Sequence, residues 1–242
     1  MGALDPRGGS NRISCNQDFF KMWSPEMSYV LGFLYADGDI VDARSSRTQY
    51  IKFTSKDREI LEKIRFVLNS SHSIRTRPPR PVFPENGKGY ISSPLFYFRI
   101  GSRRMYADLL KLGLTPNKSK AIRLPNVPDN FFSDFTRGYF DGDGCVYSEG
   151  MKNNKPKKIS VIFTSGSPLF LKELGNSLKN FLHLKHNKVY ISSRAFQLRY
   201  RMMDTLKILH FMYSTALTNL CLQRKREIYH TYLRKRPDAR AV

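Results

Sequence analysis

Two acidic residues in similar surroundings are the first candidates for chemistry in this sequence. Asp37 lies near the end of YVLGFLYADGD, residues 29–39, and Asp143 lies in the similar stretch FTRGYFDGDGCV, residues 135–146. Two carboxylates held close together repel each other unless a cation lies between them. The pair therefore predicts a divalent-metal site shared by two parts of the chain. The alternative interpretation is two buried helices that each stop at an Asp-Gly turn, which is a common turn pair.

Small residues recur at matching places in the two stretches. When the two acids are aligned, Gly32 matches Gly138 and Ala36 matches Gly142. A spacing of four residues places both small side chains on one face of a helix, where the backbone of another helix can approach closely. We therefore expect two packed helices that bring the two acids together at a pseudo-twofold axis.

Further matches indicate that the whole chain is an internal duplication. Lys118 and Lys225 follow the two acids at nearly the same distance along the chain. Other matching segments are IKFTS at 51–55 with VIFTS at 161–165, and FYFR at 96–99 with FQLR at 196–199. Because unrelated turns would not keep such a register, the duplication favours the shared metal site over the turn interpretation.

The hydrophobic pattern of each half predicts helix, two strands, helix, two strands and helix. In the first half we expect helices at 25–36, 57–69 and 102–112, and strands at 39–44, 48–55, 72–77 and 95–101. In the second half we expect helices at 131–142, 167–182 and 204–214, strands at 145–149, 158–165, 188–192 and 195–201, and a last helix at 217–234. The serines expected to begin or cap helices are Ser24, Ser55, Ser102 and Ser167.

These elements predict an α+β protein with two halves. Residues 11–113 form the first half, 114–130 a proline-containing linker, and 131–242 the second half. Residues 1–10, MGALDPRGGS, resemble an added leader sequence and are left out of the fold prediction.

The charge balance predicts a polyanionic partner. The 242 residues include 41 Lys and Arg against 20 Asp and Glu, which gives a formal net charge of +21. No apolar run approaches the ~20 residues that a membrane helix needs, so nucleic acid is a better partner than a membrane. The three cysteines, Cys15, Cys145 and Cys221, are far apart and odd in number. They imply no disulfide framework, and this fits an intracellular compartment.

Each predicted sheet has an apolar face for its helices and an open face with polar side chains that can reach base edges and phosphates. Taken singly, each of these residues could equally belong to a solvated strand face. In the first half the candidate DNA-contacting residues are Asp39, Val41, Arg44, Arg47, Thr48, Tyr50, Lys52, Thr54, Arg75, Arg77, Tyr97, Arg99 and Arg103. In the second half they are Cys145, Tyr147, Lys152, Lys155, Lys158, Ser160, Ile162, Lys188, Tyr190, Ser192, Arg194, Gln197, Arg199 and Arg201. Two such sheets side by side would form a basic saddle suited to duplex DNA.

The acids and lysines together suit phosphodiester hydrolysis. That reaction needs a positioned water, a neutralised phosphate and a stabilised leaving oxygen, and divalent ions held by carboxylates can supply all three. Lys118 and Lys225 could stabilise transition-state charge or help a proton leave the water. Their alternative role is that of surface lysines that contact a phosphate.

These features resemble the LAGLIDADG homing endonucleases in their single-chain form with two motifs. The resemblance runs from about Ser24 to Arg236 and includes LQRK at 222–225. The motifs depart from the consensus in places. Tyr35 stands where the second copy has Asp141, and Leu31 and Arg137 replace the usual small second residue.

The resemblance implies a duplicated αββαββα fold with two four-stranded antiparallel sheets, and it assigns roles to residues. The metal ligands would be Asp37 and Asp143, joined by the backbone carbonyls of Ala36 and Gly142. Lys118 and Lys225 would be the central basic residues, and Ser55 and Ser165 would position water. Mg²⁺ would be the cofactor, with Mn²⁺ able to substitute and Ca²⁺ supporting binding without cleavage.

The resemblance also implies a substrate and a product. The enzyme would bind a long duplex DNA site as a monomer, cut both strands across the minor groove and leave short 3′ overhangs. It would be encoded in an intron and act in an organelle or in a bacterial cytoplasm. Two alternatives stay open: an RNA maturase that helps its host intron fold, and a DNA-binding protein that has lost cleavage.

Overall fold

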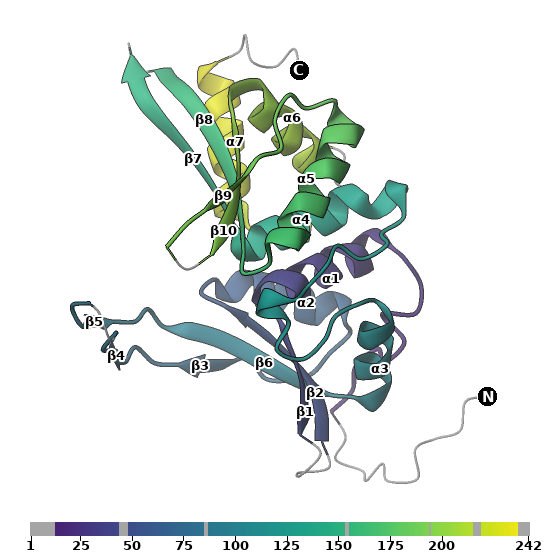
Figure 1. Ribbon diagram of the computed structural model, residues 1–242. Coiled ribbons are helices and arrows are strands. Elements are labelled where there is room, and N and C mark those ends of the chain that lie inside the picture. Colours follow the sequence, from purple (N-terminus) through teal and green to yellow (C-terminus); the bar gives the residue numbers. More distant parts are fainter. Residues whose placement is uncertain are drawn as a thin grey trace.

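The computed structural model describes residues 13–43, 48–84, 87–152, 155–193, 195–214 and 219–236. At Thr48, at 151–152 and at 155–157 it describes the backbone alone. Two similar halves, each built on a four-stranded antiparallel sheet, make up the fold (Figure 1). Within these ranges, no helix has the length and apolar character needed to cross a membrane.

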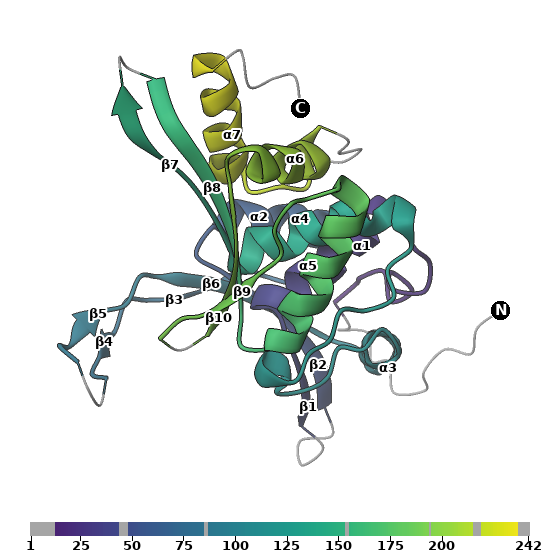
Figure 2. The ribbon, with the colours of Figure 1, turned by 45° about the horizontal axis from the view of Figure 1, so that its top comes forward.

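The first half follows the predicted order of elements. It contains α1 (Pro25–Asp37), β1 (Asp39–Ala43), β2 (Thr48–Ser55), α2 (Arg58–Val67), β3 (Arg75–Arg77), β6 (Leu95–Gly101) and α3 (Arg103–Lys111). The sheet order is β1-β2-β6-β3. The loop between β3 and β6, which the sequence left unassigned, carries a short hairpin of β4 (Pro81–Val82) and β5 (Tyr90–Ile91). Figures 1 and 2 both show this hairpin at the far end of β3 and β6, away from the helices.

The second half repeats this order. It contains α4 (Phe132–Asp143), β7 (Gly144–Lys152), β8 (Lys155–Ser165), α5 (Pro168–Leu182), β9 (Val189–Ile191), β10 (Phe196–Arg201), α6 (Met202–Tyr213) and α7 (Gln223–Lys235). The sheet order, β7-β8-β10-β9, is the counterpart of the first. The predicted duplicated αββαββα fold is therefore confirmed. The linker holds two short 3-10 helices, η2 (Lys118–Lys120) and η3 (Asp129–Phe131).

Some predicted boundaries were wrong. The long hairpin of β7 and β8 exceeds both predicted strands, and β3 is shorter than the predicted 72–77. The last helix begins at Gln223 and not at 217, and residues 217–218 lie outside the described ranges.

Helices α1 and α4 pack side by side at the junction of the two halves (Figure 1). Gly32 lies against α4 so closely that a Cβ there would come within 2.1 Å of the Phe135 carbonyl oxygen. Gly138 lies against α1 in the reciprocal way, since its Cβ would come within 2.0 Å of the Tyr29 carbonyl oxygen. Both contacts are with backbone, so only glycine permits this approach. The predicted close packing of two small-residue faces is confirmed.

Local capping explains where three of the helices begin. Ser24, Ser102 and Ser167 accept hydrogen bonds from Met27, Met105 and Phe170 N–H groups, as the N-cap prediction requires. Ser55 was wrongly predicted to cap α2. That helix has Asp57 at its N-cap, and the Ser55 hydroxyl instead accepts a hydrogen bond from the Asp57 N–H at 3.0 Å.

The strand alternation separates a buried face from an open one, as predicted. In the first sheet Ile51 and Phe53 are fully buried, and the Phe53 and Phe98 rings stack at 4.7 Å. Lys52 and Arg99 lie on the opposite face and pair directly across the strands. The helices therefore cover one face of each sheet and leave the polar face open.

Candidate active site

The two acids lie together at the ends of the central helices. Asp37 is the last residue of α1 and Asp143 is the last residue of α4. The helix ends touch, because a Cβ on Gly142 would lie 3.3 Å from the Asp37 backbone nitrogen. The carboxyl ends of both helix dipoles therefore meet at this point, and their partial negative charges favour a bound cation.

Burial and mutual repulsion disfavour the charged forms of the two acids. Burial raises the pKa of Asp143, the Asp37 charge raises it further, and the value reaches about 6 although both lysines lower it. Burial likewise raises the pKa of Asp37, against the opposing effect of Lys118 and Lys225. A divalent ion between the carboxylates would offset their repulsion and stabilise their charged forms.

Lys118 closes the end of α1. Its Nζ donates hydrogen bonds to the carbonyl oxygens of Tyr35, at 2.7 Å, and Ala36, at 2.8 Å. These carbonyls belong to the last turn of the helix, where no backbone N–H is available to them. Burial lowers the pKa of Lys118 to about 8, while the charges of Asp143 and Asp37 act to raise it.

Lys225, in the first turn of α7, binds the carbonyl groups at the end of α4 in the way that Lys118 binds those of α1. Its Nζ donates to the carbonyl oxygens of Phe140, Asp141 and Gly144 at 2.5, 2.9 and 2.6 Å. Burial lowers the pKa of Lys225 to about 8, and the Asp141 charge opposes that shift. The two predicted lysines thus lie at matching places beside the two acids.

The oxygen atoms gathered beside the two acids are of the kind that Mg²⁺ prefers. Two carboxylates and the nearby Ala36 and Gly142 carbonyls offer hard oxygen donors, although Ala36 shares its oxygen with Lys118. Among the described residues, no group of three or more His, Cys, Asp or Glu side chains could hold a metal. Mg²⁺ commonly takes only one or two carboxylates and completes its shell with water and substrate phosphates. Two carboxylates are therefore compatible with Mg²⁺, and the identity of the metal stays a prediction.

The two serines hold turns. Ser55 and Ser165 end β2 and β8, and both are 5% exposed. Their hydroxyls accept hydrogen bonds from Asp57 N–H at 3.0 Å and Ser167 N–H at 3.1 Å. Each hydroxyl keeps its proton to donate, and their role in positioning water stays a prediction.

Asp141 is a buried acid whose contacts the sequence did not predict. One of its carboxylate oxygens accepts hydrogen bonds from the Tyr29 hydroxyl and the Leu222 N–H, both at 2.8 Å. It therefore ties the first half to the start of α7, three residues before Lys225. The signal was present in the second motif, where an acid replaces Tyr35 of the first.

The motif position occupied by Arg137 is also used structurally. Arg137 is 0% exposed, pairs with Asp134 at 2.5 Å, and donates to the Met212 and Leu220 carbonyl oxygens. Its guanidinium also lies 5.4 Å from the Tyr29 ring centre. This departure from a small residue anchors α4 to the end of α6 and to the segment before α7.

The open face of the first sheet carries a row of charged side chains. In the strand register, Lys52 on β2 lies opposite Asp39 on β1 and opposite Arg99 on β6. The Arg99 guanidinium lies 5.2 Å and 5.5 Å from the ring centres of Tyr50 and Tyr97. These cation–π contacts hold the guanidinium over the face, where it can reach a nucleic acid.

The matching row of the second sheet is less charged. In the strand register, Ile162 on β8 lies opposite Cys145 on β7 and opposite Arg199 on β10. Arg199 donates to the Gln197 side-chain oxygen at 2.9 and 2.7 Å and lies 5.5 Å from the Tyr190 ring centre. The two halves therefore present different chemistry at equivalent places.

The other predicted DNA-contacting residues are distributed as follows. On or beside the strands lie Val41, Thr54, Arg75, Arg77, Tyr147, Lys158, Lys188, Ser192 and Arg201, and Arg103 begins α3. Ser160 is only 3% exposed, so it offers a ligand little surface. Outside the described residues lie Arg44, Arg47 and Arg194, together with the side chains of Thr48, Lys152 and Lys155.

Comparison with solved structures finds the same fold in endonucleases. The homing endonuclease I-WcaI, bound to its DNA recognition sequence, has a TM-score of 0.56 at 14% identity, covering 93% of this chain and 94% of that one. I-LtrWI bound to target DNA has a TM-score of 0.53 at 13% identity, covering 92% and 93%. I-AabMI bound to uncleaved DNA has a TM-score of 0.52 at 14% identity, covering 88% and 90%.

Sequence comparison gives a relative and a family. An uncharacterized protein of Methanocaldococcus jannaschii is 25% identical over 125 residues, which are 52% of this chain and 41% of that protein. The chain thus matches less than half the length of this relative. The sequence pattern of the LAGLIDADG-like domain matches residues 24–90 and 133–202. One matched segment falls in each half and together they span more than half of the chain, so the chain belongs to the LAGLIDADG family.

Proposed function

We propose that this protein is a site-specific endonuclease that hydrolyses both strands of a long duplex DNA target with divalent ions. The observation that carries the proposal is the pairing of Asp37 and Asp143 at touching helix ends, each with a buried lysine beside it. Similar folds are seen on DNA in I-WcaI and I-LtrWI, and this supports duplex DNA as the ligand.

The proposed chemistry divides among the residues of the site. Divalent ions held by the two carboxylates, with the Ala36 and Gly142 carbonyls, would neutralise the scissile phosphate and make water a better nucleophile. Lys118 and Lys225 have pKa values of about 8, so near that pH each lysine exists both as an amine and as an ammonium. The amine can accept a proton from water, and the ammonium can stabilise charge on the phosphate.

The pseudo-twofold arrangement favours a double-strand break. Each half brings one acid and one lysine to the axis, and each presents one open sheet to one half of the target. Cleavage by two such sites across the minor groove would leave the short 3′ overhangs that we propose. We further propose that the enzyme acts as a monomer, because one chain contains both halves, and that it is intron-encoded.

Cleavage of a random duplex library with Mg²⁺, followed by sequencing of the ends, tests this function. We expect one long recurring site with matched 3′ overhangs, and no products from Asp143→Asn. Asp129→Asn, which changes an exposed acid in the linker, is the matched control. Binding without cutting in Mg²⁺ and Mn²⁺ would contradict the endonuclease and indicate a DNA-binding protein or an RNA maturase.

A further inference from the structure

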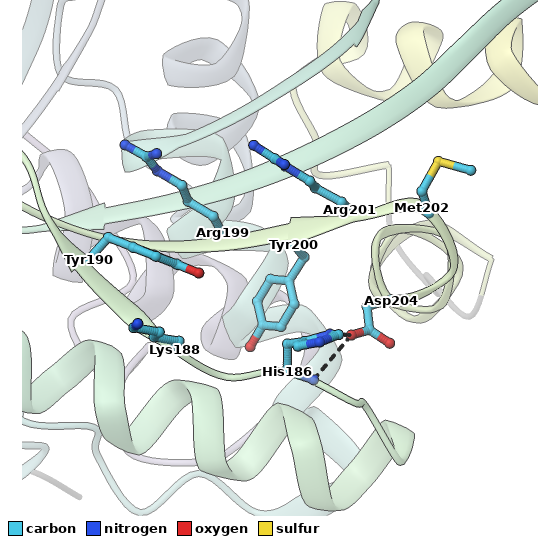
Figure 3. A pocket seen from close by; sticks show the side chains of 8 residues that line it. All are labelled: His186, Lys188, Tyr190, Arg199, Tyr200, Arg201, Met202 and Asp204. Carbon is cyan, nitrogen blue, oxygen red and sulfur yellow. Dashed lines mark hydrogen bonds and ion pairs between the residues drawn. The ribbon is translucent and has the colours of Figure 1, made fainter.

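A cavity of about 440 Å³ lies at the outer edge of the second sheet, away from the two acids. Strand β9 pairs with β10 only as far as Val189 and Leu198. Beyond that point the edge of β10 at Arg199–Arg201 has no partner strand among the described residues. The cavity occupies this edge, just before the chain enters α6 (Figure 3).

The cavity is lined by several positively charged side chains. Lys188, Arg199 and Arg201 line it, and they form no ion pair with an acid in the described part of the chain. The one acid there, Asp204, already accepts hydrogen bonds from the backbone N–H groups of Lys185 and His186, at 3.3 and 3.2 Å, and contacts the His186 ring at 3.3 Å. The three positively charged side chains therefore outnumber the single carboxylate beside them.

A buried donor without a partner points into the same cavity. Tyr200 is 1% exposed, and its hydroxyl has no hydrogen-bond partner among the described residues. Burial raises the pKa of Tyr200, so the hydroxyl keeps its proton and remains a donor. An unmade hydrogen bond of a buried group destabilises a protein. Ile100 takes the matching place in the first half, so this donor is particular to the second half.

The side chains surround the free strand edge from two sides. Figure 3 shows Arg199 and Arg201 extending to one side of β10, while the Tyr200 hydroxyl lies on the other side with Lys188 and His186. A ligand that reaches all of these groups must approach over the unpaired edge. The edge lies on the outer side of the sheet, beside the open face that carries Arg199 and Arg201.

We propose that this cavity binds one backbone phosphate of the duplex DNA, on the flank of the half-site read by the second sheet. The proposal rests on duplex DNA binding as the proposed function. A phosphate group accepts several charge-assisted hydrogen bonds at once, so it can satisfy the Tyr200 hydroxyl together with Lys188 and an arginine. Such a contact sets the register of the duplex without reading sequence.

Phosphate ethylation interference on the target duplex, with Ca²⁺ in place of Mg²⁺ so that the duplex is bound and not cleaved, tests the proposal. Wild-type protein should lose affinity when one flanking phosphate is neutralised. Tyr200→Phe, which removes only the hydroxyl, should bind at least about tenfold more weakly, as expected for one lost charge-assisted hydrogen bond. It should respond less strongly than the wild type to that ethylation, because Lys188 and the arginines still contact the phosphate, and its Tm should equal or exceed that of the wild type.

Lys188→Gln and a matched control distinguish a specific phosphate contact from the general attraction between a positively charged protein and DNA. Lys188→Gln should lower the slope of log K against log salt by about 0.9, the value for one lost phosphate contact, whereas Tyr200→Phe should leave the slope unchanged. Lys172→Gln removes an exposed charge on α5, behind the sheet, and should bind and respond like the wild type.

Each other outcome identifies which idea fails. An unchanged interference pattern in Tyr200→Phe and Lys188→Gln, with normal DNA binding, would overturn the phosphate site alone. Stabilisation of the protein by inorganic phosphate that Tyr200→Phe abolishes, with no effect on DNA binding, would assign the cavity to a free anion. Failure of the wild type to bind any duplex would overturn the proposed function as well.

Discussion

Ala36 and Gly142 occupy equivalent positions in the two halves and face each other across the junction of α1 and α4. A Cβ on Gly142 would lie 2.4 Å from the Cβ of Ala36, which is too close for two methyl groups. The axis between the two acids therefore has room for one methyl and not for two. This asymmetry sets how closely the helix ends, and with them the carboxylates, can approach.

Gly142→Ala should separate the two helix ends and disturb the metal site. We expect a loss of about 1–3 kcal/mol in the free energy of unfolding, typical of overpacking, with a larger loss of cleavage. The double variant Ala36→Gly with Gly142→Ala moves the methyl to the other helix and should recover both. Denaturant unfolding and cleavage rates check this, and failure of the double variant to recover would show that the clash is not between these two residues.

Asp143→Asn should abolish cleavage and stabilise the fold at neutral pH. The pKa of Asp143, about 6 in the folded state, is above its ordinary value of 3.8, so its charge opposes folding above pH 6. Removing it should add at most about 3 kcal/mol above pH 6 and nothing below pH 4. Unfolding without divalent ions at pH 7.5 and pH 3.5 measures the difference. A less stable variant at pH 7.5 would mean that the lysines stabilise the carboxylate more than burial destabilises it.

Lys118→Met should impair catalysis without impairing DNA binding. The lysine is buried against α1 and lies beside one of the two acids, so its loss should slow cleavage by about 10²–10⁴. The two strands should then be cut at unequal rates, because Lys225 is intact in the other half. Duplexes labelled on one strand at a time give both rates. Lys120→Met, at an exposed position of the same 3-10 helix, is the control, and equal slowing of both strands would contradict separate sites.

The two halves should prefer different bases at equivalent places of the target. Lys52 favours guanine, whereas Ile162 offers only an apolar contact that suits the thymine methyl group. Ile162→Lys should therefore shift that position of the second half-site toward guanine, by about tenfold for one such contact. Selection from duplexes randomised at that position measures the shift. An unchanged preference would show that Ile162 does not face a base.

Much of this arrangement could be predicted from local patterns. The repeated small-residue spacing predicted the α1–α4 contact, and the alternation around Ile51 and Phe53 predicted which strand faces are open. Both follow from side-chain periodicity, which a chain carries in its sequence. The positions of Asp37 and Asp143 at helix ends were predicted in the same way.

The tertiary structure alone decided which backbone groups Lys118 and Asp141 contact. Lys118 reaches carbonyls 83 and 82 positions away, and Asp141 reaches the Leu222 N–H across 81 positions. These partners are backbone groups left unpaired at helix ends, which any sequence possesses. A backbone carbonyl has no residue type, so no sequence pattern marks which side chain will reach it. Only the packed chain determines that.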